Sequence, residues 1–79
     1  MNDKHNLAMD LRRICVWILQ GSDELADRVL EKDIKLYGQL KVKIGKINIQ
    51  DWLTMIRIRK NGKKATAERA LTAAEILLS

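Results

Sequence analysis

The sequence predicts an all-α protein, a compact bundle of four short helices that forms a single domain over residues 1–79. Apolar residues recur at the spacing of one helical face in several long segments, which is the main signal for amphipathic helices. Proline is absent, and the four glycines lie about one secondary element apart, so they mark the ends of segments. The apolar residues are mainly Leu, Ile, Ala and Val, with two Trp, one Tyr and no Phe, which favours helix packing over a β-sandwich.

The first helix is predicted over about residues 3–20. Its apolar stripe has the spacing i, i+4, i+7, i+8, i+11 and consists of Leu7, Leu11, Ile14, Cys15 and Ile18. Gly21 stands where a left-handed residue ends a helix, because glycine has no Cβ to clash in that conformation. Ser22 can then cap the next helix, whose first turn places Asp23 and Glu24 at the positive end of the helix dipole.

The second helix is predicted over residues 23–44, with an alternative for its last part. In the helical interpretation, Gly38 interrupts the helix without ending it, and Gly45 follows the last turn. In the alternative, Gly38 ends the helix and residues 40–44 form a strand, because apolar residues alternate there with lysines. Gly45 and Lys46 would then form the type II′ turn of a hairpin around residues 40–49. The sequence leaves residues 40–46 open between helix and strand.

The third helix is predicted over residues 49–60 and the fourth over residues 66–78. Asn48 is a suitable N-cap for the third helix, and Asn61 with Gly62 would end it. Alanine is frequent on the apolar face of the fourth helix and permits close approach of a neighbouring helix. Apolar residues cover nearly two-thirds of that helix, more than a small monomeric bundle needs, so we expect a homodimer.

Positive charge is concentrated in the second half of the chain. The net charge is +5, and residues 1–40 contain six Lys/Arg and seven Asp/Glu, whereas residues 41–79 contain nine and three. Six cations fall within thirteen residues with only Glu68 among them, and we predict that they form a nucleic-acid-binding surface: Arg57, Arg59, Lys60, Lys63, Lys64 and Arg69. A basic turn between two helices presents cations and a helix N-terminus together, which suits a phosphate backbone.

Catalysis and metal binding have little support in the sequence. His5 and Cys15 are the only histidine and cysteine, whereas a structural zinc site needs about four nitrogen or sulfur ligands. Gly45-Lys46 and Gly62-Lys63 lack the spacing of a phosphate-binding P-loop. The acidic residues between positions 23 and 33 alternate with cations and are interpreted as an ion-paired helix face. We therefore expect no enzyme activity, no metal and no cofactor.

The location of the protein follows from further absences. The longest uncharged run, Ile14–Ser22, has nine residues, whereas a membrane span needs about 20 apolar residues. The N-terminus lacks the basic start and apolar stretch of a secretory signal, and a single cysteine forms no disulfide within the chain. We expect a cytoplasmic protein with no membrane span.

The second half of the chain shares an order of elements with a known family. A lysine-containing strand at residues 40–44 would precede a helix through Trp52 and Ile56, then the Gly62 turn and a second helix. In this order residues 40–79 resemble the ribbon-helix-helix family of DNA-binding repressors. The resemblance implies an obligate dimer that pairs strands, with Lys41 and Lys43 in the major groove. The chain departs from the family at Lys64, where serine or threonine is usual, and in its 38 preceding helical residues.

The expected function is that of a small non-enzymatic regulatory protein that binds nucleic acid through the basic helix-turn-helix surface. The alternative is a dimeric helical adaptor for protein–protein interaction. In that case Met9, Val16 and Ile76 would form the protein interface, and the cations would dock an acidic protein partner.

Overall fold

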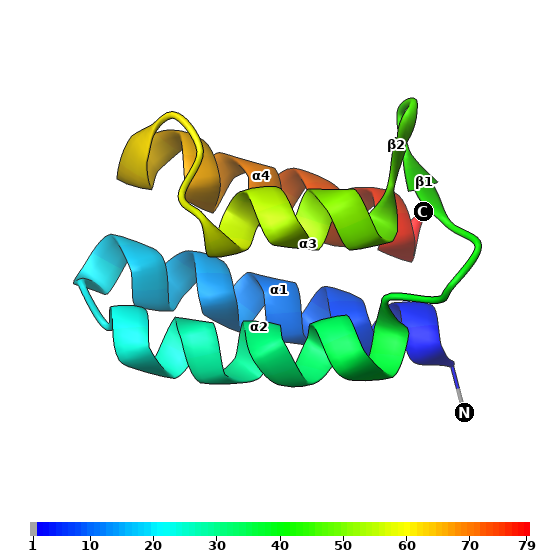
Figure 1. Cartoon of the computed structure of the whole chain (residues 1–79), viewed down its shortest axis with the longest axis horizontal. Helices are drawn as coiled ribbons and strands as arrows, with labels where there is room; N and C mark the ends of the chain where they lie inside the picture. Colours follow the sequence, from blue (N-terminus) through cyan, green and yellow to red (C-terminus); the bar gives the residue numbers. More distant parts are fainter. Residues whose placement is uncertain (1) are drawn as a thin grey trace.

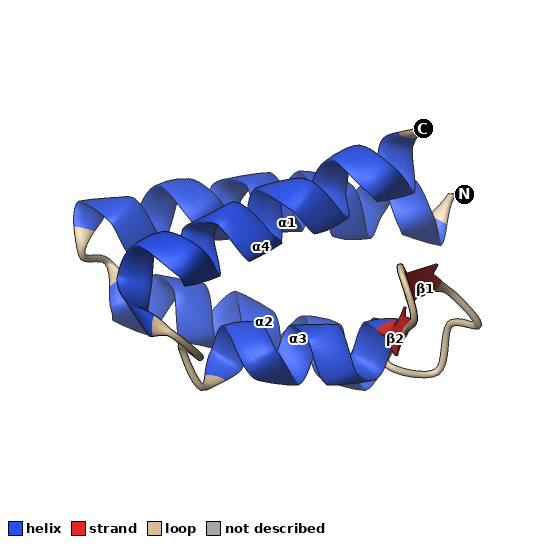
Figure 2. Cartoon of the chain, turned by 90° about the horizontal axis from the view of Figure 1, so that it is seen from above, coloured by secondary structure: helices blue, strands red, loops and turns tan. Residues whose placement is uncertain are grey.

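The computed structural model describes residues 2–79 and confirms the all-α bundle of four helices. The elements are, in chain order, α1 (Asp3–Gln20), α2 (Asp23–Tyr37), β1 (Lys43–Ile44), β2 (Ile47–Asn48), α3 (Ile49–Arg57) and α4 (Gly62–Leu78). Successive helices run in opposite directions, and α1 packs on both α2 and α4, while α3 closes the bundle between α2 and α4 (Figure 1). The α2–α3 connection and the two chain ends therefore lie together at one end of the bundle, and the two short turns lie at the other (Figures 1 and 2).

The bounds of α1 agree with the prediction because the chain has a local capping signal at each end of this helix. The side chain of Asn2 accepts a hydrogen bond from the backbone N–H of His5 at 3.2 Å and caps the start. Gly21 has φ 82, and its N–H donates to the carbonyl of Ile18, which ends the helix in the left-handed conformation. Ser22 occupies the N-cap position of α2, but its side chain makes no capping bond there, in contrast to our expectation.

The second helix ends at Tyr37, so the prediction that it extends to residue 44 is wrong. Beyond Gly38 the chain becomes extended, and residues 43–44 pair with residues 47–48 as an antiparallel hairpin with Lys43 opposite Asn48. Gly45 has φ 65, as the first central residue of a type II′ turn requires. In an extended chain successive side chains point to opposite faces, so Ile44 is buried while Lys43 is exposed. The third helix still begins at Ile49, as predicted.

The turn between α3 and α4 is tighter than expected, so both helix bounds shift. The third helix ends at Arg57 instead of residue 60, and the fourth begins at Gly62 instead of residue 66. Arg59 and Asn61 adopt the left-handed conformation, with φ 58 and 66, and reverse the chain within four residues. The first turn of α4 thus contains Lys63 and Lys64, whose charges oppose the helix dipole.

The core runs along the centre of the bundle and receives side chains from every helix and from the hairpin. The α4 side facing the core is built from alanine, and these methyl groups allow α4 to approach α1 closely, which is the most extensive helix contact in the molecule. The largest fully buried apolar side chains come from the first three helices: Leu7, Leu11, Ile14, Ile18, Leu30, Ile49, Leu53 and Ile56. Trp52 donates its indole N–H to the carbonyl oxygen of Arg69 at 3.1 Å and so joins α3 to α4.

Candidate nucleic-acid interface

Two arginines of the predicted surface are paired with the acidic face of α2. One guanidinium nitrogen of Arg57 lies 3.6 Å from Asp27, and the other donates to Glu31 at 3.2 Å. Arg59 donates to Asp27 at 2.9 Å and lies 3.6 Å from Asp23. These contacts bind the end of α3 to α2. The positive charges of Arg57 and Arg59 are therefore largely compensated by acidic side chains of the protein itself.

The guanidinium of Arg59 also completes the C-terminus of α3. Its Nη1 donates to the carbonyl oxygens of Ile56 at 2.7 Å and of Arg57 at 3.2 Å, at the last turn of the helix, and the backbone N–H of Arg59 also donates to Ile56. Arg69 acts in a similar way and donates to the carbonyl oxygen of Lys60, which holds the turn against α4. All three predicted arginines thus have structural contacts in addition to any binding role.

The three predicted lysines are the members of the set that remain available. Lys60, Lys63 and Lys64 are exposed and form no ion pair or side-chain hydrogen bond within residues 2–79. They lie on the α3–α4 turn and the first turn of α4, where the prediction placed them. The structure therefore brings the six cations into one region but divides them into two ion-paired arginines, Arg69 with a backbone hydrogen bond, and three lysines with neither.

A second group of lysines gathers at the opposite end of the bundle. A depression of about 320 Å³ is lined by Lys4 from α1, Lys41 and Lys43 from the hairpin segment, and the last residues of α4. Lys46 lies in the hairpin turn. No aspartate or glutamate side chain lines the depression, and none of these four lysines forms an ion pair in the part of the chain that the structure describes. Lysines are therefore the only charged side chains among the residues that line this depression.

The predicted site did not include this lysine group. Its members Lys41, Lys43 and Lys46 were visible as the alternation of lysine with apolar residues, and the family resemblance pointed to the first two. Lys4 could not be connected with them, because only the tertiary structure brings the start of α1 beside the hairpin. In contrast to the resemblance, the strand segment pairs with β2 of its own chain.

A buried carboxyl pair between α1 and α2 was also missed. Asp33 is fully buried, and neither of its oxygens has a hydrogen-bond donor among the described residues. Burial raises the pKa of Asp33 to about 8, supported by a hydrogen bond with Asp10 and by the Asp10 charge, while Lys32 lowers it. A protonated Asp33 can donate to Asp10, which pairs one Asp33 oxygen and leaves the other without a donor. Burial, together with the charges of Asp33 and Asp10, raises the pKa of Tyr37.

Other chemistry has little geometric support in residues 2–79. Burial raises the pKa of the Cys15 thiol, which reduces the reactive thiolate form. No three acidic, histidine or cysteine side chains of the described chain meet in a way that could hold a metal ion. None of the helices that the structure describes combines the length and the apolar character of a membrane span. The candidate site is therefore a charged surface.

Comparison of the chain with protein-family models, with curated proteins and with solved structures found no match.

Proposed function

We propose that this protein binds nucleic acid through lysines that its own ion pairs leave free. The observation that carries the proposal is the charge of residues 41–64, which form the hairpin, α3 and the following turn. This strip has six unpaired exposed lysines and a single carboxylate, Asp51. Its lysines are Lys41, Lys43, Lys46, Lys60, Lys63 and Lys64.

The lysines of the strip lie in two groups, one at each end of α3. The nine residues of α3 span about 13 Å at 1.5 Å per residue, which equals about four steps of 3.4 Å along one nucleic-acid strand. The hairpin tip and the α3–α4 turn project on the same side of the molecule, away from α1 and α2 (Figure 1). A backbone lying along α3 would therefore meet both groups.

Salt dependence is the quantitative test of this surface. If four of the six lysines neutralise phosphates, log Kd plotted against log salt should have a slope of about 4 for a duplex and about 3 for a single strand. Fluorescence anisotropy with a labelled duplex and a labelled single strand, at several salt concentrations, measures both slopes. Replacing Lys41, Lys43 and Lys46 by Glu, or Lys60, Lys63 and Lys64 by Glu, removes about two of these contacts and should lower the slope by about 1.8 for the duplex and about 1.4 for the single strand.

A matched control separates local contacts from net charge. Replacing Arg12, Arg28 and Lys35 by Glu changes the net charge equally, but these exposed side chains lie on α1 and α2. The proposal expects this control to bind more tightly than either lysine variant. Equal losses in all three variants, or no binding by the natural protein at low salt, would overturn it.

We also infer a second candidate function, self-association through a groove between α1 and α4. Cys15, Leu19, Ala67 and Leu71 line an almost purely apolar depression of about 190 Å³. Leu19 and Leu71 are 54% and 40% exposed, so this surface is incompletely covered in one copy.

The occupant that fits this groove is a second copy of the chain. Lys64 and Glu68 stand at the rim of the groove, so a two-fold arrangement would place the lysine of each copy near the glutamate of the other. Light scattering at micromolar concentration should give twice the monomer mass, and Leu71→Glu should restore the monomer. Exposed Thr72→Glu is the control. A monomeric natural protein would rule out this function without affecting nucleic-acid binding.

A further inference from the structure

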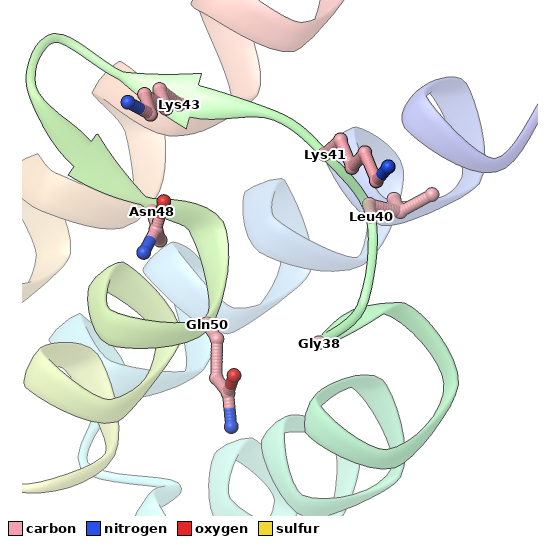
Figure 3. A pocket seen from close by; sticks show the side chains of 6 residues that line it. All are labelled: Gly38, Leu40, Lys41, Lys43, Asn48 and Gln50. Carbon is pink, nitrogen blue, oxygen red and sulfur yellow. The ribbon is translucent and has the colours of Figure 1, made fainter.

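The lysines of the strip over residues 41–64 offer separate point charges to a nucleic acid. Lys41 and Lys43 line a depression of about 580 Å³ at the hairpin end, but their amino groups point to opposite sides (Figure 3). Each would therefore meet a phosphate by itself. The planar guanidinium of arginine, in contrast, can donate two parallel hydrogen bonds to one phosphate. The strip contains two arginines, Arg57 and Arg59, so such a contact depends on whether either of them can be released.

Arg59 is held too firmly to serve a ligand. Its side chain is only 22% exposed and donates to Asp27 at 2.9 Å. The same guanidinium donates to two carbonyl oxygens in the last turn of α3. Release of Arg59 would remove several charge-assisted hydrogen bonds at once. Arg59 therefore anchors the turn and stays in place when a phosphate approaches.

Arg57, the last residue of α3, is held by weaker contacts. Its side chain is 41% exposed, and its side-chain partners among residues 2–79 are Glu31 at 3.2 Å and Asp27 at 3.6 Å. Glu31 is 59% exposed, and an ion pair between two such exposed side chains contributes little to stability. A phosphate oxygen accepts from the same guanidinium edge as a carboxylate does. The edge of Arg57 that faces Glu31 can therefore change its partner.

Glu31 has a second cation within reach after it leaves Arg57. Lys35 lies four residues further along α2, which is the spacing and order at which glutamate and lysine pair on a helix. Lys35 is exposed and forms no ion pair in the part of the chain that the structure describes. Asp27 keeps its shorter contact, because Arg59 stays in place. Glu31 can thus exchange Arg57 for Lys35, and no acidic side chain is left without a cation.

We propose that the Arg57–Glu31 ion pair is an autoinhibitory contact: Glu31 occupies the guanidinium edge of Arg57, and a nucleic-acid phosphate displaces it. The inference rests on the proposed nucleic-acid function and deepens it, because it adds a regulated arginine contact to the lysines of the strip. The apparent affinity is reduced by the fraction of molecules in which Glu31 holds Arg57. The natural protein therefore binds less tightly than its cations allow.

The variant Arg57→Gln tests whether Arg57 meets a phosphate. In anisotropy titrations it should lower the slope of log Kd against log salt by about 0.9 for a duplex and about 0.7 for a single strand. Loss of one exposed ion pair changes stability little, and circular dichroism verifies that the helices are retained. An unchanged slope would overturn the inference, because Arg57 would then make no phosphate contact.

The variant Glu31→Gln tests the inhibition. It should lower Kd about two- to fivefold, which corresponds to the strength of one exposed ion pair. The slope should stay that of the natural protein, because the same phosphates are contacted. In the Arg57→Gln background, Glu31→Gln should lose this gain, since no guanidinium is left to release.

A matched control is the exposed ion pair of Glu24 and Arg28, which lies on α2 outside the strip with a nitrogen–oxygen distance of 3.3 Å. Glu24→Gln removes the same charge as Glu31→Gln and also releases an arginine. It should change Kd much less than Glu31→Gln, and Arg28→Gln should leave the slope unchanged.

The outcomes separate the inference from the function on which it rests. Binding by the natural protein with the expected salt slope, combined with equal effects of Glu31→Gln and Glu24→Gln, overturns the autoinhibitory contact and leaves the function standing. A gain from Glu31→Gln that persists in the Arg57→Gln background also overturns the contact, since Glu31 would then act only by repelling phosphates. Absence of binding at low salt by the natural protein and by every variant overturns both.

Discussion

Replacement of Asp33 by asparagine is expected to stabilise this protein at neutral pH. The carboxyl group of Asp33 is fully buried between α1 and α2, beside Asp10 and Lys32, and Tyr37 lies near the same carboxylates. Ionisation would place two negative charges together in a site with no hydrogen-bond donor for Asp33 in the described chain. The folded protein therefore holds a proton that the unfolded chain releases at neutral pH.

The magnitude follows from the pKa of Asp33, which burial raises from 3.8 to about 8. Each pH unit between these values lowers the free energy of unfolding by about 1.36 kcal/mol, because the folded state binds the proton more tightly than the unfolded state. Stability from this group is thus complete below pH 3.8 and is lost as the pH rises to about 8. The interval from pH 3.8 to pH 7 covers about three pH units, so at pH 7 the retained proton of Asp33 lowers the free energy of unfolding by about 4 kcal/mol.

Asparagine has almost the same shape, can donate to Asp10, and does not ionise in the unfolded chain. We expect Asp33→Asn to raise the free energy of unfolding by about 2–4 kcal/mol at pH 7, and by much less at pH 4. Urea unfolding monitored by tryptophan fluorescence and circular dichroism, at pH values from 4 to 8.5, measures both changes. Glu75→Gln on the exposed side of α4 is the control and should change stability by less than about 0.5 kcal/mol. Parallel stability curves for natural protein and variant would refute the reasoning.

Two further predictions concern the turns. Arg59→Ala should lower the free energy of unfolding by about 2–3 kcal/mol, because it removes charge-assisted hydrogen bonds to Asp27 and to the end of α3. The control, exposed Arg28→Ala, should lower it by less than about 1 kcal/mol in the same urea assay. Equal losses in the two variants would contradict the role of Arg59 in anchoring α3 to α2. Gly45→Ala should cost about 1–2 kcal/mol, because φ at this position is 65; Lys46→Ala in the same turn should change the midpoint little, and a neutral Gly45→Ala would contradict the turn assignment.

Local signals in the sequence were sufficient for α1 and for the start of α3. The apolar stripe of α1 and Gly21 act within a few residues of the helix end, and the apolar period that begins at Ile49 marks the start of α3, although the side chain of Asn48 makes no capping bond there. The 40–44 segment was ambiguous because its alternation suited a strand while an isolated hairpin is marginal in water. The tertiary structure selects the extended form, because Ile44 packs into the core and Leu40 and Val42 pack against it.

The candidate site likewise combines features that the sequence predicts with features that only the tertiary structure determines. Clustering of cations near residues 57–69 is a property of the sequence, but ion pairing is not, because Asp27 and Glu31 lie about 30 residues away from their arginine partners. The same limit applies to Asp33, whose position in the α2 pattern was interpreted as part of a solvated face. Burial of this group depends on how α1 packs on α2.

The sequence by itself thus determined the helical class, the bounds of α1, the starts of α2 and α3, and the excess of positive charge in the second half. These features depend on periodicity, capping and composition, which act over short distances along the chain. The tertiary structure alone decided which cations remain free and where they gather. Charge compensation depends on distances through space, and only folding brings α2 against the end of α3 and Lys4 beside the hairpin.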